Sequence, residues 1–310
     1  MKILYMGTPD FAVKPLEALI EAEHEIVGVF TQPDKPKGRG MKMAFSPVKE
    51  CAIAHGIPVY QPETMRNGAV KDLLAELDPD LIAVVAYGKL LPGYVLRYPK
   101  YGCVNVHGSL LPKYRGAGPI QWAVINGDSV TGVTTMLMAK GMDTGDMLLK
   151  EELVIGENDT AEDVFNRLSD IGASLLVKTV VGLAAGEITA VPQDETLATY
   201  APMLTKDDGR INWNKSAQQI FDLVRGTSPW PGAFTTIGDT VYKLFDMTKT
   251  ELTSDRPAGT LLSAEKDGFT VVCGDGRVLK IKDIQAPGKK RMPAADFFRG
   301  HALFERFDVV

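Results

Sequence analysis

The sequence predicts an α/β protein: a doubly wound, Rossmann-like parallel sheet domain followed by a smaller, OB-like β-barrel domain. In residues 1–185, short apolar runs alternate with helical patterns, which is typical of βαβ units and a parallel sheet. Beyond residue 207, one helical pattern is followed by short strand-like runs at hairpin spacing, which favours a small antiparallel barrel. A chain of 310 residues is long enough for two domains that each bury a core.

The first strand, helix and strand set the parallel pattern. An apolar run over residues 2–6 ends at Gly7, an amphipathic stretch continues to about Ala22, and the next strand is expected at 25–30. The turn after the first strand reads GTPDFA, so the GxGxxG pattern of dinucleotide-binding proteins is absent there. This counts against a nicotinamide-dependent oxidoreductase. The pattern continues with a helix at about 47–55, a strand near 57–60, a helix over 70–77 and a buried strand at 81–88.

A long segment, residues 31–47, interrupts this pattern with the sequence TQPDKPKGRGMKMAFSP. It is rich in Pro and Gly and has no regular period, and such long loops inside a compact domain are often functional. Four cations stand within eight residues and without an acid among them: Lys35, Lys37, Arg39 and Lys42. Charge alone allows two interpretations, a solvated mobile loop or a basic arm that contacts phosphates.

The strongest candidate for a functional site is the strand that ends at Gly108. Apolar Val104 and Val106 alternate with Asn105 and His107, so the two polar side chains are expected on one side of the strand. In a doubly wound sheet, polar side chains at the carboxyl end of a strand project into the crevice where ligands bind. The following SLLPKYRGAGP is too rich in Pro and Gly for a helix and predicts a shaped loop.

A distant aspartate stands in a second candidate turn. A helix at about 120–126 and a strand over 132–138 lead to AKGMDTGDM, which carries Asp143 between two glycines. Asp in such turns commonly bonds its own backbone, and this simpler interpretation is kept for Asp146. The domain is completed by a strand at 148–155 and by a long amphipathic helix over 160–183, which begins with the N-cap pattern DTAED.

Residues 186–206 have no convincing period, so we place the domain boundary there. We expect an N-terminal domain at 1–188 that contains the insertion 31–47, a linker at 189–206, and an OB-like domain at 207–310. Within the last part, residues 277–291 carry six Lys or Arg against one Asp. These charges fit either a solvated strand edge or a surface that binds a nucleic-acid backbone.

The composition is ordinary for a globular protein, with 45% hydrophobic residues, 24% charged residues and a net charge of −5. This balance gives no general nucleic-acid signal, so any such contact must be local. The three cysteines Cys51, Cys103 and Cys273 form no CxxC or Cys/His cluster, so neither a disulfide framework nor a metal site is expected. Cys103 is more simply a small packed residue than a nucleophile. Without a signal-peptide core, an apolar run of about 18 residues or a patterned association helix, we expect a cytoplasmic monomer with no membrane span.

Together these motifs resemble the folate-dependent formyltransferase family. A lone His at a strand end is usually a core residue, but Asn-x-His followed by SLLP and by an Asp in a Gly-flanked turn is far more specific. The resemblance implies that Asn105, His107 and Asp143 are catalytic and surround the formyl group of 10-formyltetrahydrofolate, a co-substrate that needs no metal. It also implies that the folate is contacted by Ser109, Leu110, Leu111 and Pro112, and that the loop containing Leu90 lines the slot for the flat pterin ring.

A finer likeness, over essentially the full length, is to the methionyl-tRNA formyltransferases. It rests on the segments MGTPDFA, FTQPDKPKGRG, SPVK and RGTSPWPGAF. In that family the insertion and the C-terminal barrel hold the acceptor arm of initiator methionyl-tRNA, which is formylated for translation initiation. The implied tRNA contacts are Arg39, Lys37 and Lys42 in the insertion and Lys280, Lys282, Lys289 and Lys290 in the barrel.

The implied chemistry gives each polar group a role. Asn105 would donate a hydrogen bond to the oxyanion that forms when a neutral amine attacks the formyl carbon. His107 would stabilise the same charge or assist proton transfer, and Asp143 would orient His107 or a bridging water and favour the charged imidazole. Phe11, near the exit of the first strand, is a candidate wall of the methionine pocket.

Three other functions stay open at this stage. A formyltransferase for a small amine, such as a nucleotide sugar, would leave the two basic segments unexplained. A hydrolase that releases formate from the same folate would use water in place of the amine. A non-enzymatic RNA-binding protein would leave the three polar residues without a role.

Overall fold

The computed structural model describes residues 1–37 and 42–309, and the chain divides into two compact units. The N-terminal unit contains residues 1–119, 130–154 and 165–201, and the C-terminal unit contains residues 120–129, 155–164 and 202–310. Two short segments from earlier in the chain, residues 120–129 and 155–164, therefore belong to the C-terminal unit. Each unit is described by itself below.

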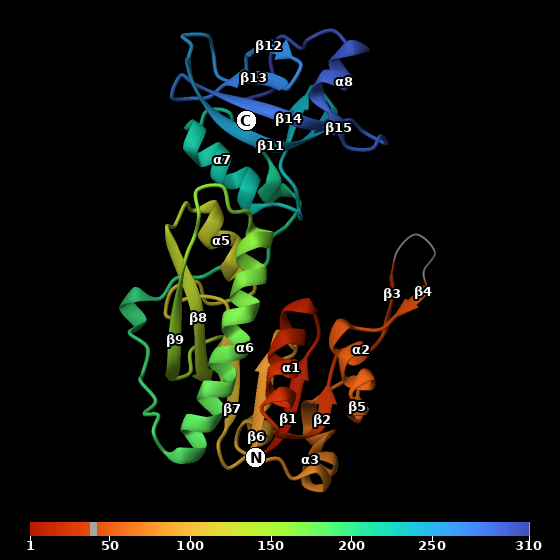
Figure 1. The fold of residues 1–310 in the computed structure, drawn as a ribbon, viewed down its shortest axis with the longest axis vertical. Helices are drawn as coiled ribbons and strands as arrows, with labels where there is room; N and C mark the ends of the chain where they lie inside the picture. The colour runs from red at the N-terminus through yellow and green to blue at the C-terminus, as the bar shows by residue number, and fades with distance from the viewer. Residues whose placement is uncertain (38–41, 310) are drawn as a thin grey trace. The chain divides into compact units, whose positions relative to one another are not determined.

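The N-terminal unit is built on a seven-stranded sheet with the order β5-β2-β1-β6-β7-β8-β9 (Figure 1). The order departs from β1 toward both edges, which is the doubly wound arrangement predicted from the sequence. The fold class is confirmed for this part. Five neighbouring strands are parallel: β5 (Val59–Tyr60), β2 (Glu25–Phe30), β1 (Lys2–Gly7), β6 (Leu81–Val85) and β7 (Cys103–His107).

The last two strands run the other way. β8 (Val130–Leu137) pairs antiparallel with β7, and β9 (Met147–Val154) pairs antiparallel with β8. The alternating sequence pattern predicts parallel strands and misses this reversal. A parallel crossover needs a connection that packs back over the sheet, whereas residues 108–118 form a loop and the following helix α5 (Pro119–Ile125) belongs almost entirely to the other unit.

The register of β8 matters for the site. His107 lies opposite Thr134, and Val104 lies opposite Leu137. Because the two strands are antiparallel, β8 ends near the beginning of β7 and not near its carboxyl end. The segment that follows β8, loop 138–146, therefore has to turn back before Asp143 can approach His107.

Helices cover both faces of the sheet, and they set which way the polar pair on β7 points. One face is covered by α1 (Val13–Glu21) and α6 (Ala161–Ala185) (Figure 1). Gly172 lets α6 lie close to β7, because a Cβ at that position would be 3.1 Å from Val106. Val106 therefore faces α6, and its neighbours in the strand face the other side.

The opposite face is covered by α3 (Lys71–Leu77) and α4 (Gly93–Leu96). Leu4 and Met6 of β1 join an apolar cluster there with Leu74 of α3 and with Val95 of α4. Cys103 belongs to the same cluster and is buried. Since Cys103, Asn105 and His107 alternate along β7, the polar pair lies on this side of the sheet.

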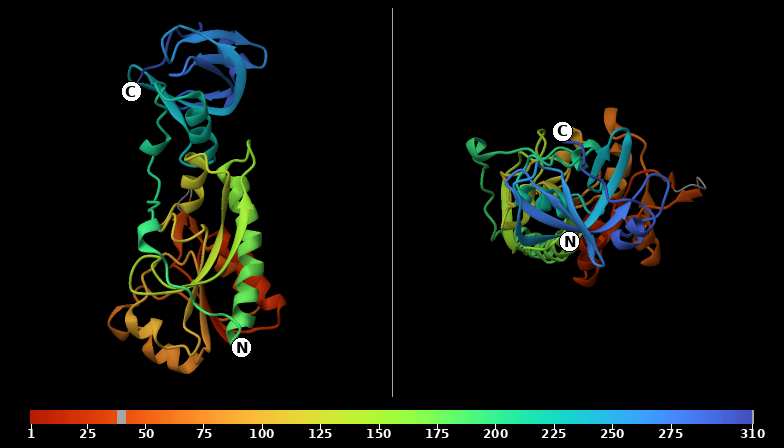
Figure 2. Two further views of the ribbon diagram at one scale, coloured as in Figure 1. Left: turned by 90° about the vertical axis from the view of Figure 1, so that its left-hand side faces the viewer. Right: turned by 90° about the horizontal axis from the view of Figure 1, so that it is seen from above.

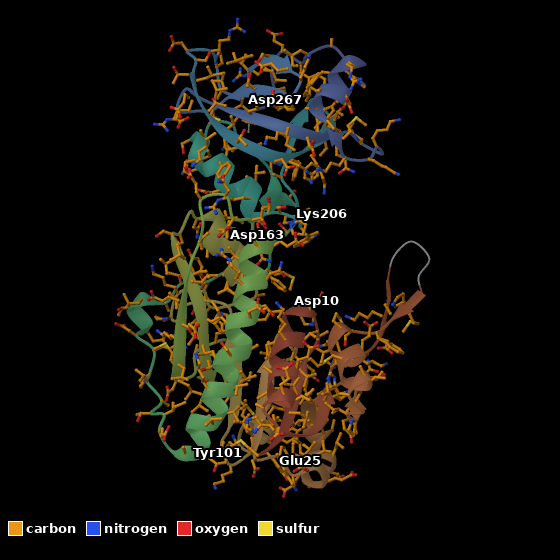
Figure 3. The ribbon with its side chains drawn as sticks, viewed as in Figure 1. Asp10, Glu25, Tyr101, Asp163, Lys206 and Asp267 are labelled. Carbon is orange, nitrogen blue, oxygen red and sulfur yellow. The ribbon has the colours of Figure 1, made fainter. Side chains whose placement is uncertain are left out.

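α6 is the long helix that the DTAED pattern predicts. Asp163 lies in its first turn (Figure 3). Thr160 and Asp163 exchange hydrogen bonds, which satisfies backbone groups that a helix N-terminus leaves free. The helix is long and apolar enough to cross a membrane, with a mean hydropathy of 1.5 over an 18-residue window. Half of that window is buried in the protein, and the core helix of a soluble protein passes the same test.

The insertion at 31–47 is more regular than its sequence suggests. β3 (Lys35–Lys37) pairs antiparallel with β4 (Lys42–Ala44), so the segment contains a hairpin where the sequence predicts an unpatterned loop. The hairpin leads into α2 (Pro47–Ala54), whose N-cap Ser46 accepts a hydrogen bond from the main chain of Lys49. Arg39 lies outside the described residues.

The C-terminal unit is an antiparallel sheet against which the predicted helix α7 packs, and a further short helix, α8, packs against it as well. The strand order is β10-β11-β14-β13-β12, with β15 also paired to β14. The long strand β11 changes register with β14 near its end, and the sheet curls (Figure 2). The elements are α7 (Ala217–Gly226), β10 (Phe234–Ile237), β11 (Thr240–Thr253), β12 (Leu261–Glu265), β13 (Gly268–Val272), β14 (Arg277–Gln285), β15 (Met292–Pro293) and α8 (Ala294–Arg299).

The core of this unit is aromatic and aliphatic. Trp213 and Phe307 are fully buried and stack with their ring centroids 5.5 Å apart. The indole N–H of Trp213 donates to Thr235, so its one polar group is satisfied. Ile220 and Phe221 of α7 pack into the same core.

Short 3₁₀ turns are found in both units, at η1 (Asp10–Ala12), η2 (Arg66–Gly68), η3 (Glu195–Leu197) and η4 (Asp207–Gly209).

Candidate active site

Asn105 and His107 lie side by side on one face of β7, as the alternating pattern predicts. Both residues are buried, and no side-chain hydrogen bond of Asn105 is recorded within the described part of the chain. The Asn105 amide atoms are not among the fully buried polar atoms that lack a partner, so they keep some access to the surface. The Asn105 amide is therefore available to a ligand.

The ring of His107 is oriented by a backbone carbonyl oxygen, which can accept a hydrogen bond but cannot donate one. Its Nε2 lies 2.9 Å from the carbonyl oxygen of Tyr114, so Nε2 carries the hydrogen of this bond. The Tyr114 backbone has a positive φ of 60°, an uncommon conformation that turns the chain back beside His107. Nδ1 is left as the ring atom with a free lone pair, and it faces Asp143.

Asp143 reaches the site from loop 138–146. Its Oδ2 accepts a hydrogen bond of 2.8 Å from the main-chain N–H of Gly116 and lies 3.7 Å from His107 Nδ1. A separation of 3.7 Å is too long for a direct hydrogen bond, and a charge interaction arises across it only when the imidazole is protonated. The structure therefore brings all three predicted catalytic residues together.

Two residues that the sequence analysis missed hold this arrangement. Arg115 is fully buried and donates to Glu195 on one side, at 2.8 Å, and to Gln193 on the other. Hydrogen bonding to the Glu195 carboxylate raises the pKa of Arg115 and lowers the pKa of Glu195. Gln193 in turn donates to the carbonyls of Asp143 and Gly145. Arg115 stands inside the SLLPKYRG motif and could have been singled out, whereas Gln193 carries no sequence signal.

Segment 193–201, which lies entirely within the expected linker 189–206, is bonded to loop 108–118. The main chain of Arg115 donates to Thr199 and accepts from Ala201, and the N–H of Gly118 also donates to Ala201. Tyr114 N–H donates to the Thr199 hydroxyl at 2.8 Å. These bonds fix the path of the loop that carries the contacts to His107 and Asp143.

The conformation of the SLLP run is held by hydrogen bonds to Thr134 of β8. Thr134 donates to the carbonyl of Ser109 and accepts from the N–H of Leu111, at 2.7 and 3.1 Å. The Ser109 hydroxyl donates to the carbonyl of Lys113, and Leu111 is buried. Leu110 and Pro112 are half-buried. Of the four predicted folate contacts, Ser109 and Leu111 thus serve the shape of the loop, while Leu110 and Pro112 present surface.

The exits of β1, β2 and β6 meet at a second loop. Thr8 and Gln32 both donate to the carbonyl of Tyr87, at 3.1 and 3.0 Å, which ties three strand ends together. Leu90 in the same loop is 78% exposed, whereas the neighbouring Leu91 is buried in the core. An exposed leucine beside strand ends is apolar surface available to a flat ring.

Phe11 and Cys103 belong to the packing of the unit. Phe11 is buried against Phe165 of α6, with ring centroids 5.2 Å apart. The Cys103 thiol donates to the carbonyl of Val95, and burial raises the pKa of Cys103 to about 12. A thiol with that pKa is inert near neutral pH. Within the described residues, no cluster of three or more His, Cys, Asp or Glu could hold a metal ion.

The predicted tRNA contacts in the C-terminal unit are not equivalent. Lys280 is held at 2.9 Å by Asp267, which lies on the turn between β12 and β13 (Figure 3), and at 3.4 Å by Glu265, the last residue of β12. Lys282, Lys289 and Lys290 are exposed, and among the described residues none of them has a recorded ion pair. In the insertion, Lys37 and Lys42 face each other as a backbone pair of the hairpin.

Comparison with known proteins identifies the relatives of both parts. The sequence model of the formyl transferase family matches residues 1–180, and that of the formyl transferase C-terminal domain matches residues 203–302. A methionyl-tRNA formyltransferase of Alkaliphilus oremlandii is 53% identical over 303 residues, which cover 98% of this chain and 97% of that protein. One of Clostridioides difficile is 47% identical over 303 residues and 98% of each chain.

Solved structures share the fold at lower identity. An N-formyltransferase from Helicobacter canadensis, in complex with folinic acid and dTDP-3-aminofucose, is 19% identical with a TM-score of 0.68, over 92% of this chain and 99% of that one. HypX from Aquifex aeolicus in complex with tetrahydrofolic acid is 16% identical with a TM-score of 0.66, over 96% of this chain. The chain spans about half the length of HypX, 47%.

Proposed function

This chain belongs to the formyl transferase family, and from that premise we infer that it acts as a methionyl-tRNA formyltransferase, moving a formyl group to the amine of tRNA-bound methionine. The observation that carries this conclusion is the full-length identity of 53% and 47% to proteins of that name. The N-formyltransferase from Helicobacter canadensis is only 19% identical and shares the fold alone. The reaction serves translation initiation, and we propose the cytoplasm as its location.

The formyl donor we propose is 10-formyltetrahydrofolate, which supplies the formyl group on its N10 atom. Two features of this chain suit it: the exposed apolar surface of Leu90 for a flat ring, and the unpaired amide of Asn105 for the formyl oxygen. The Asn105 NH₂ group would donate to that oxygen as it gains negative charge. Losing one such donor typically costs about 100- to 1,000-fold in rate.

His107 and Asp143 would handle the proton. The C–N bond to the methionine amine forms, the bond from the formyl carbon to N10 breaks, the amine loses a proton and N10 gains one. Nδ1 of His107 would take the proton from the amine, directly or through water, because Nε2 is already bonded to Tyr114. The imidazolium would then lie beside the Asp143 carboxylate, which stabilises its charge.

The basic segments would bind the tRNA backbone. Phosphate contacts make affinity fall steeply with salt. Arg39, with Lys37 and Lys42 as helpers, is our proposal for the main contact in the insertion. The Arg39→Ala variant should therefore weaken the use of charged tRNA and leave folate binding unchanged. Equal damage to folate binding would indicate misfolding and would refute this assignment.

Single-turnover formylation tests the function directly. Purified protein and 10-formyltetrahydrofolate are mixed with methionyl-initiator tRNA, with free methionine or with a nucleotide amino-sugar. Fast transfer only to the charged tRNA is expected. Transfer to the sugar amine instead, or release of formate without an acceptor, would overturn the proposal.

The catalytic assignment is tested in the same assay. The variants Asn105→Ala, His107→Ala and Asp143→Ala should each lose most turnover while they keep the melting temperature of the unmodified protein. Near-normal turnover in two of the three would reject the assignment.

A further inference from the structure

Loop 138–146 follows β8, and it has to run back antiparallel to β8 to bring Asp143 close to His107. β8 ends at Leu137, opposite Val104, which is three residues or roughly 10 Å along β7 from His107. Asp143 Oδ2 nevertheless lies 3.7 Å from His107 Nδ1. Asp143 has a positive φ of 52°, so the turn that aims its carboxylate is not one that the chain adopts freely. Something outside the loop has to hold it.

Gln193 makes the contacts that hold this turn. Its Nε2 donates to the carbonyl of Asp143 at 2.7 Å and to the carbonyl of Gly145 at 2.8 Å, so the amide spans the turn on both sides of Thr144. Both of its N–H groups are used for this purpose. A carbonyl oxygen can only accept hydrogen bonds, so the amide atom that faces Asp143 and Gly145 must be the nitrogen.

The other side of the Gln193 amide is fixed just as firmly. Its Oε1 accepts from Nε and Nη2 of Arg115, at 3.0 and 2.8 Å. A guanidinium can only donate hydrogen bonds, so the amide atom facing Arg115 must be the oxygen. The two carbonyls and the guanidinium therefore specify the same orientation of the amide independently. Arg115 is fully buried and its main chain is bonded to Thr199 and Ala201, so the anchor itself cannot move away.

The carboxylate and the main chain of Asp143 are thus both held by one short stretch of loop 108–118. Gly116 binds its carboxylate, and Arg115, through Gln193, binds its main chain. We infer that Gln193 is a positioning residue for formyl transfer: it holds Asp143 at the distance from His107 that the reaction requires. This inference rests on the proposed function, since it gives Gln193 a task only if Asp143 acts in catalysis.

Two substitutions separate the tasks of the amide. Gln193→Glu keeps an acceptor for Arg115 but replaces the donating NH₂ by an oxygen that faces two carbonyls. Gln193→Ala removes both sets of contacts. We expect both variants to lower kcat of formyl transfer by about 10- to 100-fold, because misplacing a reacting group by about 1 Å costs about 100-fold. The KM values for folate and for charged tRNA should change by less than about threefold.

A matched control comes from the next residue. The carboxylate of Asp194 accepts from the N–H and the hydroxyl of Thr196, and among the described residues it has no recorded hydrogen bond or ion pair to loop 138–146. Asp194→Ala removes two hydrogen bonds from the same segment, as many as Gln193→Glu loses to loop 138–146, yet it should leave kcat unchanged. A folded Gln193→Glu protein with a normal melting temperature and full kcat would overturn the inference, and so would an equal loss in Asp194→Ala.

A double-mutant cycle distinguishes positioning from a general structural role. If Gln193 acts through Asp143, adding Gln193→Glu to Asp143→Ala should lower kcat by less than about twofold further, because the group to be positioned is already gone. Independent, multiplicative losses would reject the inference. Failure of the proposed function is recognised separately, because the unmodified protein would then not formylate methionyl-initiator tRNA. Failure of the catalytic assignment would leave Asp143→Ala with near-normal turnover, whatever Gln193→Glu does.

Discussion

Replacing Asp143 by Asn tests the electrostatic half of the mechanism with little change of shape. The Asn side chain can keep an oxygen toward the N–H of Gly116, which now donates to Asp143 Oδ2 at 2.8 Å. The positive φ of 52° at this position is one that Asn tolerates better than most residues. The variant should therefore fold normally and lose only the negative charge beside His107.

The size of the effect follows from the geometry. The charge lies 3.7 Å from His107 Nδ1, and the two side chains are only 7% and 17% exposed. At the effective dielectric constant of about 20 that suits such sites, two unit charges at this separation interact by about 4 kcal/mol. If the imidazolium forms in the transition state, removing the carboxylate raises the barrier by up to that amount, or about 1,000-fold in rate.

Single-turnover formylation of methionyl-initiator tRNA measures this loss without interference from product release. Asp146→Asn is the matched control, because Asp146 is exposed in the same turn and carries the same charge. Asp143→Asn should be about 1,000-fold slower and Asp146→Asn unchanged. A rate within about threefold of the unmodified protein for Asp143→Asn would refute the reasoning, as would a similar loss in both variants.

Three other features give expected outcomes. Gly145→Ala should lower the single-turnover rate about 100-fold, because its Cβ would lie 1.6 Å from the carbonyl oxygen of Leu137 and the turn that carries Asp143 would shift; an unchanged rate would contradict this. The three cysteine thiols of the native protein should not react with iodoacetamide at pH 8, and the treated protein should keep its activity, because burial keeps the thiols protonated until far higher pH. Mass spectrometry detects the adduct, and modification at pH 8 would contradict the assigned pKa values. Those pKa values are about 11 for Cys51, about 12 for Cys103 and about 12 for Cys273. Lys282→Ala should reduce the salt dependence of tRNA affinity by about one unit of slope, whereas Lys280→Ala, which removes a charge already paired with Asp267, should change it less.

The central pair of the site could be predicted because it depends on local geometry. Alternation in a strand puts Asn105 and His107 on one face whatever surrounds them, and a buried strand in a βαβ pattern ends at a crevice. The same reasoning gives the doubly wound order of the parallel strands. These inferences need only the period of the sequence.

The direction of β8 and the roles of Arg115 and Gln193 depend on contacts between residues far apart in the chain. Nothing near Gln193 in the sequence indicates that its amide meets two carbonyls about 50 residues earlier. The proximity of Asp143 to His107 is similar. The motif indicates that Asp143 belongs to the site, but the return of loop 138–146 against β8 is fixed by Gly145, Gly116 and Gln193 together.

Counting charges along the sequence overstates the positive charge that the C-terminal unit can offer to a nucleic acid. Of the six cations in 277–291, Lys280 is offset by Asp267 and Glu265, and Arg291 is bonded to Asp246 and Asp283. Exposed ion pairs of this kind are worth little to stability, yet each cancels a charge that a phosphate would otherwise meet. The cations with no recorded ion pair in the described part of the chain are Arg277, Lys282, Lys289 and Lys290. With so few free cations there, tRNA affinity has to be shared with the insertion, so a variant in either segment alone should weaken binding only partly and the two losses should multiply.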